Sequence, residues 1–556
     1  MTTAATATTA AKARRAIKEA TEREGTVKDR TFDVLRQYGL TTLFSNPGST
    51  EVGFLADLPA DIEFVLGLHE GSVVGMATGH ALASGRPALV LLHTTAGYGN
   101  AVSALATARA NRAPLVVVVG QQDRRHLAHE PFLAGRLDGL AGQYPVWQHT
   151  PARPQDVPGA VARAWHEARE GRGPAMVVVP MDDWLAPADE DAPLAAPVAV
   201  QGGRRASDSA IEDLAELLGK AEKPCLVAGA GNDSPEGWAA LVPLAERLGC
   251  PVFQEAFGAR AGFPQDHRLF AGHLPAVRSG LRKVLAPYDA VLVVGAAPFR
   301  QYPYAPGDFT EPGTRLAVIT DDPEEAHRSP AECVLLAEPA DSVRRLTALL
   351  PARTGSPQPV RRNPPAPPEE GEPLRAAHVL AALAARLDPQ TVVVEETPSS
   401  RPDLHALLPA RAPFGFLSAA MGGLGFAMPA AVGVRRAAPD RPVVAVLGDG
   451  SSLYSVQALW SAAHYGVGVL FVVLANGRYA IMDRLAEREG AAAPAWPAFT
   501  ELRVSALARG LGCPAERVED HAALLSVLDK VMPGLADRQE PLVLEVSVEA
   551  DPEYHS

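Results

Sequence analysis

The sequence predicts an α/β protein with three domains, each built from a parallel sheet flanked by helices. Strand-like apolar runs alternate with helix-like segments along almost the whole chain, which is the pattern of repeated βα units. Some of these runs are apolar at every position, as in Val443 to Leu447, and such strands are buried on both faces of a sheet. A chain of 556 residues is too long for one hydrophobic core, so we expect about three domains.

Shifts in composition place the expected domains at residues 26–197, 207–350 and 373–550. Residues 351–372 are rich in proline, which removes backbone donors and fixes φ, so this segment is expected to be a linker. Residues 1–25 are rich in Ala and Thr but lack the apolar core of a signal peptide, which indicates a flexible leader.

The composition argues against several classes of partner. The formal net charge of −13 argues against nucleic acid, since a phosphate backbone requires a basic surface. No apolar run reaches the roughly 18–20 residues that a membrane-spanning helix needs, so no membrane partner is expected. The four cysteines lack the spacing of a zinc site or a disulfide framework. With 47% hydrophobic and 21% charged residues, the composition is that of a soluble globular protein. Because the leader lacks the apolar core of a signal peptide, we expect the protein to be cytoplasmic.

Two polar segments in the third expected domain follow apolar strands. One strand runs directly into Gly448-Asp449-Gly450-Ser451, and the strand-like run 467–474 ends just before Asn476-Gly477-Arg478. Because the carboxyl ends of parallel strands meet at one edge of a sheet, both polar segments should emerge together. Asp449 and Asn476 then offer the oxygen ligands that Mg²⁺ prefers, so the sequence predicts a site for a metal and a diphosphate.

We expect a helix from about Ser452 to Tyr465 between these two strands, with its N-terminus available to an anion. The two glycines that flank Asp449 let the backbone turn sharply and approach a ligand closely. The alternative interpretation is a plain tight turn followed by an ordinary loop, with no ligand bound at either.

Three polar side chains in the first expected domain lie just beyond strand-like segments. These are Ser49, Glu70 and His93. In open α/β sheets, ligands bind at this edge. The alternative is structural, because a glutamate at a helix start often only complements the helix dipole and a histidine after a strand often only packs.

Taken together, these segments resemble the thiamine-diphosphate-dependent 2-oxo acid decarboxylase and acetohydroxyacid synthase superfamily, and within it the benzoylformate decarboxylases. The resemblance runs from about residue 26 to residue 550. The matching segments are Asn-Pro-Gly-Ser at 46–49, His93 with Ala-Gly-Tyr-Gly-Asn at 96–100, Gly-Gln-Gln at 120–122, Asp-Asp-Trp at 182–184, Gly-Gly-Leu-Gly-Phe-Ala at 422–427 and the segment 448–479. The resemblance implies that the three expected domains are, in order, a pyrimidine-binding, a central and a diphosphate-binding domain.

The resemblance also implies how the chain would bind its cofactor, thiamine diphosphate. Glu70 would contact the aminopyrimidine ring, Leu424 would bend the cofactor, and the Gly422 carbonyl would lie beneath its 4′-amino group. The other implied cofactor-binding residues are Ser399, Asp449, Gly450, Ser451, Asn476 and Tyr479.

The implied metal is Mg²⁺, bound through the side chains of Asp449 and Asn476 and through the backbone carbonyl of Arg478. In the superfamily the cofactor is held at a subunit interface. The resemblance therefore implies at least a homodimer, with a homotetramer as the expected assembly.

The implied reaction is non-oxidative decarboxylation of a benzoylformate-like 2-oxo acid to an aldehyde. Ser49 would bind the substrate carboxylate, and His93 would move protons, since an imidazole titrates near working pH. Tyr302 stands where benzoylformate decarboxylases carry a second catalytic histidine. A phenol with a pKa near about 10 shuttles protons poorly, so we expect carboligation to an aldehyde acceptor as a side activity.

Two other functions remain open. The first is an acetolactate-synthase-like carboligase that makes hydroxyketones or acyloins. The second is an inactive, cofactor-binding partner subunit, although the presence of Glu70, Asp449 and Asn476 argues against it. In the central block, Ala228-Gly229-Ala230-Gly231 is a weak signal for a nucleotide phosphate, and structural use of these glycines is favoured.

Overall fold

The computed structural model describes residues 25–189, 194, 196–197, 199–200, 202–353 and 363–550. Nearly all of the expected leader, and part of the expected linker, lie outside the described residues. The chain divides into two compact units: unit 1 comprises residues 1–200 with 432–437, and unit 2 comprises residues 201–431 with 438–556. Among the described residues, no helix has the length and apolar character needed to cross a membrane.

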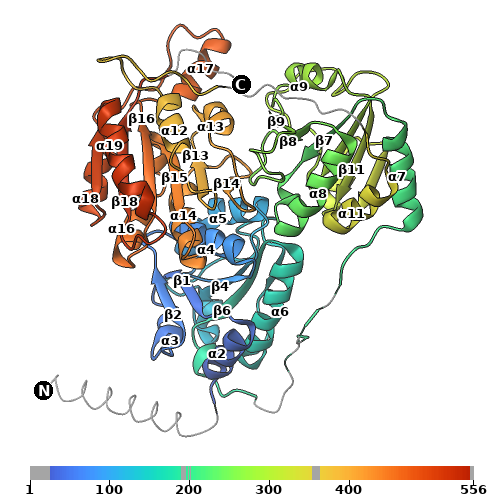
Figure 1. Ribbon diagram of the computed structural model, residues 1–556. Helices are drawn as coiled ribbons and strands as arrows, with labels where there is room; N and C mark the ends of the chain where they lie inside the picture. Colours follow the sequence, from blue (N-terminus) through green and yellow to red (C-terminus); the bar gives the residue numbers. More distant parts are fainter. Residues whose placement is uncertain are drawn as a thin grey trace, which may run out of the picture. The chain divides into compact units, whose positions relative to one another are not determined.

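Three sheets of six strands, parallel throughout, form the framework of the chain and confirm the predicted α/β class (Figure 1). The first sheet lies in unit 1 and has the order β2-β1-β3-β4-β6-β5. Its strands are β1 (Thr42–Asn46), β2 (Glu63–Leu66), β3 (Ala88–Leu92), β4 (Leu115–Gln121), β5 (Trp147–His149) and β6 (Pro174–Pro180). Its helices are α2 (Val27–Tyr38), α3 (Val52–Leu55), α4 (Glu70–Ser84), α5 (Thr95–Ala110) and α6 (Val157–Gly171).

The helix ends of unit 1 follow from local chemistry. α2 begins after Thr26, whose hydroxyl accepts a hydrogen bond from the Asp29 amide, and it ends at Gly39, where φ is 66°. β3 and β4 are buried at every position, as expected for central strands covered on both faces.

The second sheet lies in unit 2 and has the order β12-β11-β10-β7-β8-β9. Its strands are β7 (Pro224–Ala228), β8 (Val252–Gln254), β9 (Phe270–His273), β10 (Ala290–Val294), β11 (Arg315–Thr320) and β12 (Cys333–Leu336). The accompanying helices are α7 (Asp208–Lys220), α8 (Pro235–Leu248), α9 (Arg278–Leu285), α10 (Pro323–His327) and α11 (Pro339–Leu349).

The third sheet, also in unit 2, has the order β14-β13-β15-β16-β18-β17. Its strands are β13 (Val392–Glu396), β14 (Phe416–Ser418), β15 (Val443–Gly448), β16 (Leu470–Ala475), β17 (Ala515–Val518) and β18 (Leu542–Ser547). The helices of this region are α12 (Ala376–Ala384), α13 (Arg401–Leu407), α14 (Ala427–Ala437), α15 (Asp449–Ser452), α16 (Ala458–His464), α17 (Ala480–Arg488), α18 (Val504–Gly510) and α19 (His521–Val531).

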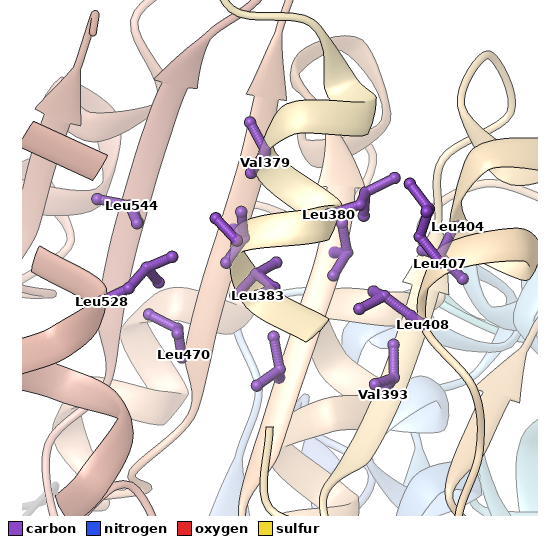
Figure 2. Packing of buried hydrophobic residues seen from close by; sticks show 14 of the residues in the cluster. Val379, Leu380, Leu383, Val393, Leu404, Leu407, Leu408, Leu470, Leu528 and Leu544 are labelled. Carbon is purple, nitrogen blue, oxygen red and sulfur yellow. The ribbon is translucent and has the colours of Figure 1, made fainter. Parts of the chain in front are cut away.

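Helix α12 packs on the third sheet through one apolar face (Figure 2). Val379, Leu380 and Leu383 recur at helical spacing and are buried. Their neighbours in the same core come from α13, α19 and the strands, and include Val393, Leu404, Leu407, Leu408, Leu470, Leu528 and Leu544. This packing fixes β13, whose carboxyl end leads into the candidate site.

The helix expected from Ser452 to Tyr465 is wrong in its bounds. The chain is helical already at α15, directly after β15, and becomes helical again only at α16. Between these helices, the amides of residues 453–455 donate to carbonyls three residues back, which tightens the chain into turns. A helix of one turn therefore follows Gly448 in place of the long helix that the pattern predicted.

The glycines of the Ala228–Gly231 segment serve close packing of two backbone segments. A Cβ on Gly229 would lie 2.5 Å from the carbonyl oxygen of Gly295, and a Cβ on Gly231 would lie 2.8 Å from the same atom. Gly295 itself has a φ of 74°, which favours glycine. Packing therefore accounts for these glycines without a bound nucleotide.

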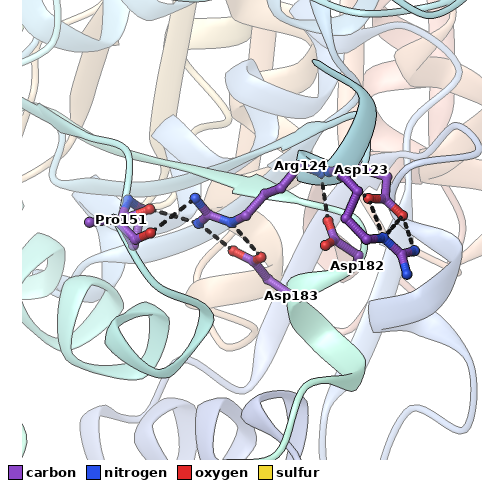
Figure 3. A network of polar contacts seen from close by, with 7 residues as sticks. Asp123, Arg124, Pro151, Asp182 and Asp183 are labelled. Atoms are coloured by element: carbon purple, nitrogen blue, oxygen red, sulfur yellow. Dashed lines mark hydrogen bonds and ion pairs between the residues drawn. The ribbon is translucent and has the colours of Figure 1, made fainter. Parts of the chain in front are cut away.

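A buried ion pair joins the end of β4 to the segment after β6 in unit 1 (Figure 3). Arg124 donates from Nε to Asp183 at 2.7 Å and from Nη2 to the Pro151 carbonyl at 2.6 Å, while its amide donates to Asp182 at 3.0 Å. The Asp183 side chain is completely buried, and burial raises its pKa. The Arg124 guanidinium is therefore the group that keeps this carboxylate charged inside the protein.

We expect Arg124→Met to destabilise unit 1 by about 3–5 kcal/mol, because it leaves the buried Asp183 carboxylate without its partner. Urea unfolding followed by circular dichroism measures this change. The penalty should shrink as the pH falls, since the raised pKa of Asp183 lets the carboxyl become neutral. The matched control is Arg125→Met, which removes an arginine that is 80% exposed and should change little. Equal midpoints for the two variants would contradict the expectation.

Candidate active site

The polar residues of unit 1 gather at the carboxyl edge of the first sheet. β1 lies between β2 and β3, and all three strands are parallel, so their carboxyl ends lie side by side. The loop 47–51 follows β1, Glu70 begins α4 after β2, and His93 follows β3. Ser49 is exposed in that loop.

The carboxylate of Glu70 is buried and is held by two asparagines. Asn46 donates to Oε1 at 3.0 Å, and Asn100 donates to Oε2 at 3.1 Å. Glu70 is also the first residue of α4, where the helix dipole favours a negative charge. Each carboxylate oxygen keeps a second lone pair, so the group can still accept a proton or a hydrogen bond from a ligand.

His93 is oriented by a second buried carboxylate, that of Glu51. Its Nδ1 lies 3.0 Å from Oε2 of Glu51 and 3.0 Å from the Thr50 hydroxyl. Because a carboxylate can only accept, Nδ1 carries the proton and Nε2 is left as the basic nitrogen. The side chain of Glu51 is fully buried, whereas that of His93 is 13% exposed. Of this pair, only His93 therefore reaches the surface.

Glu70 and His93 both lie close to Gly97 in unit 1. A Cβ on Gly97, in the first turn of α5, would lie 3.1 Å from Cβ of His93 and 3.4 Å from Oε1 of Glu70. Ser49 precedes Thr50, whose hydroxyl contacts the His93 ring. The structure therefore brings all three sequence-predicted residues of this unit to one region.

In unit 2, the carboxylate of Asp449 lies against the loop after β16. Its Oδ2 accepts from the Gly477 amide at 2.7 Å, and its Oδ1 accepts from the Gly450 amide at 2.8 Å. Gly477 stands between Asn476 and Arg478, so the structure brings these three predicted residues together. The Asn476 side-chain oxygen accepts from the Arg478 amide at 3.1 Å. Burial raises the pKa of Asp449.

The oxygen donors at this loop fit a magnesium ion that is also bound by phosphate and water. They do not fit a metal bound by protein side chains alone. Within the described part of the chain, no three His, Cys, Asp or Glu side chains gather as a metal site. Asp449, Asn476 and a backbone carbonyl of the same loop are hard oxygen donors that leave several positions to phosphate and water. Mg²⁺ prefers this combination.

The remaining residues predicted to contact the diphosphate also lie at this edge. β13, β15 and β16 are adjacent parallel strands, so the segments that follow them emerge together. The Ser399 hydroxyl accepts from the Ile481 amide at 3.0 Å. The Tyr479 ring covers Gly450, where a Cβ would lie 2.8 Å from Cε1 of the tyrosine. Ser451 is buried in α15.

Glu396 holds the loop that carries Gly422 and Leu424. Its side chain accepts from the amides of Gly425, Phe426 and Ala427 at 2.8, 2.7 and 2.7 Å. Burial raises the pKa of Glu396 to about 7. The carboxyl group at the end of β13 thus fixes the backbone at residues 425–427, where the loop ends. Leu424 is partly exposed within it.

Tyr302 lies in a large cavity of unit 2. The cavity has a volume of about 1140 Å³, and Gly422, Pro398 and Ile481 also line it. Tyr302 is 59% exposed. The cavity therefore reaches the Gly422 loop and the Ser399 region, whereas Leu424 and Asp449 are not among its lining residues.

Reasoning from the sequence missed two carboxylates, Glu51 and Glu396. Both are buried, and each positions another part of the site. A signal was available for Glu396, because a charged residue at the end of an otherwise apolar strand requires a partner. Glu51 gave no signal, since its partner lies 42 positions along the chain.

Three family models match the chain, and all describe thiamine pyrophosphate enzymes. The N-terminal TPP binding domain matches residues 25–141, the central domain matches residues 211–346, and the C-terminal TPP binding domain matches residues 399–546. Domains that bind thiamine diphosphate are thus present.

Individual relatives give the same result. The chain is 38% identical over 535 residues to a benzoylformate decarboxylase of Pseudomonas aeruginosa, covering 94% of this chain and 98% of that protein. It is 27% identical over 542 residues to an acetolactate synthase large subunit of Corynebacterium glutamicum, covering 88% and 81%. A solved structure, a thiamine diphosphate-dependent 4-hydroxybenzoylformate decarboxylase of Rhodococcus jostii RHA1, has a TM-score of 0.90 at 34% identity and covers 95% of this chain and 100% of that one. The chain therefore belongs to the thiamine pyrophosphate enzyme family, as a carboxy-lyase or carboligase.

Proposed function

We propose that this enzyme uses thiamine diphosphate and Mg²⁺ to decarboxylate a 2-oxo acid, of the benzoylformate type, to an aldehyde. The observation that carries the proposal is the buried Glu70 carboxylate, fixed by Asn46 and Asn100 beside His93. Similarity to benzoylformate and 4-hydroxybenzoylformate decarboxylases supports the substrate class. The proposed assembly is at least a homodimer, and a homotetramer is expected.

Thiamine diphosphate, when bound, supplies the nucleophile for the substrate carbonyl and the electron sink that makes loss of CO₂ possible. In unit 1, Glu70 would hold a proton at the aminopyrimidine nitrogen, and Ser49 would bind the substrate carboxylate through its hydroxyl. His93, with Nδ1 facing Glu51, would use Nε2 to take or give a proton at the substrate oxygen.

In unit 2, the residues around β15 and β16 would bind the charged end of the cofactor. Asp449, Asn476 and the Arg478 carbonyl would hold Mg²⁺, which neutralises the diphosphate. Other residues would contact the cofactor itself. At the diphosphate end these are Ser399, Gly450, Ser451 and Tyr479, and in the loop that Glu396 holds they are Gly422 and Leu424.

The test is product analysis by mass spectrometry. The purified protein is given thiamine diphosphate, Mg²⁺ and a panel of aryl and aliphatic 2-oxo acids, with and without an added aldehyde. We expect CO₂ and the corresponding aldehyde in equal amounts from at least one aryl 2-oxo acid. Turnover of pyruvate alone, with hydroxyketone as the main product, would favour an acetolactate-synthase-like enzyme, and no turnover of any acid would favour an inactive subunit.

Carboligation is the second candidate activity, and Tyr302 is the residue that favours it. Tyr302 lines the cavity that also holds Gly422, and a phenol delivers protons more slowly than an imidazole near neutral pH. We expect Tyr302→His to lower the ratio of hydroxyketone to aldehyde severalfold, measured with benzaldehyde as acceptor. Tyr304→His is the matched control, because Tyr304 is 84% exposed. An unchanged ratio in Tyr302→His would remove Tyr302 from the mechanism.

A further inference from the structure

The cavity that holds Tyr302 and Gly422 is lined by positive charge alone. Its charged lining residues are Arg300, Arg401, Arg411, Arg484 and Arg488, and among the described residues no Asp or Glu lines it. This charge is local, since the whole chain carries a formal net charge of −13. A cleft lined by one sign of charge concentrates ions of the opposite sign.

The arginines reach the cavity from separate segments. Ile481, Arg484, Leu485 and Arg488 recur at helical spacing, so one face of α17 lines the cavity with two arginines one turn apart. α13 contributes Arg401. Convergence of cations from several segments costs electrostatic repulsion, which an anionic ligand would relieve.

Arg401 and Arg484 form ion pairs with carboxylates that lie outside the lining. Arg401 lies 2.8 Å from the buried Glu395, and Arg484 lies 2.8 Å from Glu487. A guanidinium has five N–H donors, so a paired arginine keeps donors for a second anion. Both pairs therefore orient their arginines and keep two guanidinium groups charged beside the cavity.

The other polar groups of the cavity are neutral, and much of its wall is apolar. His273 and His405 stack with ring centroids 3.8 Å apart, and burial lowers the pKa of His405 to about 3. The apolar wall includes Phe257, Leu274, Leu407, Ile481 and Leu485. The volume of about 1140 Å³ exceeds the roughly 300–1,000 Å³ of ordinary small-molecule sites. The cavity thus offers room, an apolar wall and cations.

We propose that the substrate is a 2-oxo acid with a second anionic group, a carboxylate or phosphate, at the far end of an apolar spacer. This inference rests on the proposed function, in which Gly422 contacts the cofactor that reacts with the substrate carbonyl. Arg484 and Arg488 bind the distal anion, because a guanidinium matches the oxygens of either group in pairs. The apolar wall covers the spacer.

The test compares matched substrates on the full-length enzyme loaded with thiamine diphosphate and Mg²⁺. The pairs are 4-carboxybenzoylformate with benzoylformate and 2-oxoadipate with 2-oxohexanoate, and 4-phosphonobenzoylformate distinguishes phosphate from carboxylate recognition. We expect kcat/KM to be at least about tenfold higher for the anionic member of a pair, the effect of one charged hydrogen bond. In the double variant Arg484→Gln/Arg488→Gln this ratio should fall toward one. Arg509→Gln, an exposed arginine outside the cavity, should keep it.

Three other results would distinguish the anion site from the proposed function. Equal kcat/KM within both pairs overturns the anion site and leaves the proposed function standing. If the double variant loses thiamine diphosphate affinity by the same factor as it loses kcat/KM for the anionic substrates, these arginines bind the cofactor diphosphate. That result also overturns the inference. If no 2-oxo acid reacts but terephthalate binds more tightly than benzoate, and the double variant abolishes the difference, the anion site is supported and the proposed function fails.

Discussion

Glu70→Gln should lower kcat by about 10²- to 10⁴-fold, the usual contribution of a positioned proton-transfer group. Glutamine preserves the shape of the side chain but can neither accept nor release the proton that the proposed chemistry needs. Turnover of the best 2-oxo acid from the product panel measures the loss. The substitution should leave the fold intact, because one amide oxygen still accepts from Asn46 or Asn100 and the other asparagine can rotate its amide.

Two further measurements separate catalysis from structure in this variant. Thermal unfolding should shift only slightly, and cofactor binding, followed by quenching of tryptophan fluorescence, should persist within about tenfold. The control is Glu170→Gln, which changes an exposed glutamate of the same unit and should match the wild type. Full turnover in Glu70→Gln would show that another group moves this proton.

The approximate position of the site in each sheet could be predicted, because it depends on where the strands end. Parallel strands deliver their carboxyl ends to one edge, so the residues after each apolar run must gather there. This reasoning located Glu70 and His93 in one sheet and Asp449 and Asn476 in another. It needs only the apolar runs and the polar residue that follows each run.

The contacts that the supporting residues make could not be predicted in the same way. Glu51 reaches His93 across 42 positions, and Glu396 reaches the Gly425 amide across 29. Such contacts depend on loop conformations that no local pattern encodes. The arginines of the cavity are similar, because Arg300, Arg401 and Arg484 belong to distant segments and each alone looks like an ordinary surface charge. The predicted bounds of the helix after β15 were wrong for a local reason, because residues 453–455 form turns that interrupt the helix.

Asp449→Asn should reduce the stabilisation that cofactor and metal give to the wild type by half or more. The substitution removes the charge that a magnesium ligand contributes, so we expect Mg²⁺ affinity to fall by at least about tenfold to a hundredfold. It also turns an acceptor into a donor, because both Asp449 oxygens accept from backbone amides, those of Gly450 and Gly477. At cofactor concentrations near 100 Kd, the wild type gains about 2.7 kcal/mol on binding, and a variant with tenfold to hundredfold lower affinity should gain only about 1.4 to 0.4 kcal/mol. Differential scanning fluorimetry with and without thiamine diphosphate and Mg²⁺ measures the difference, and Asp537→Asn at an exposed position is the control.

The pH dependence of this effect identifies the group responsible. Burial raises the pKa of Asp449, so protons compete with Mg²⁺ for its oxygens at a higher pH than at an ordinary aspartate. In the wild type, the apparent Mg²⁺ affinity should therefore weaken as the pH falls through that raised pKa. The sign is opposite for the protein without metal, since a raised folded-state pKa makes the neutral carboxyl the stable form, and stability is lost as the pH rises. Asp449→Asn should remove both dependences, because asparagine does not titrate. If the variant kept the wild-type pH dependence of metal binding, Asp449 would not be the metal ligand, and the diphosphate would have to be held from another part of the third sheet.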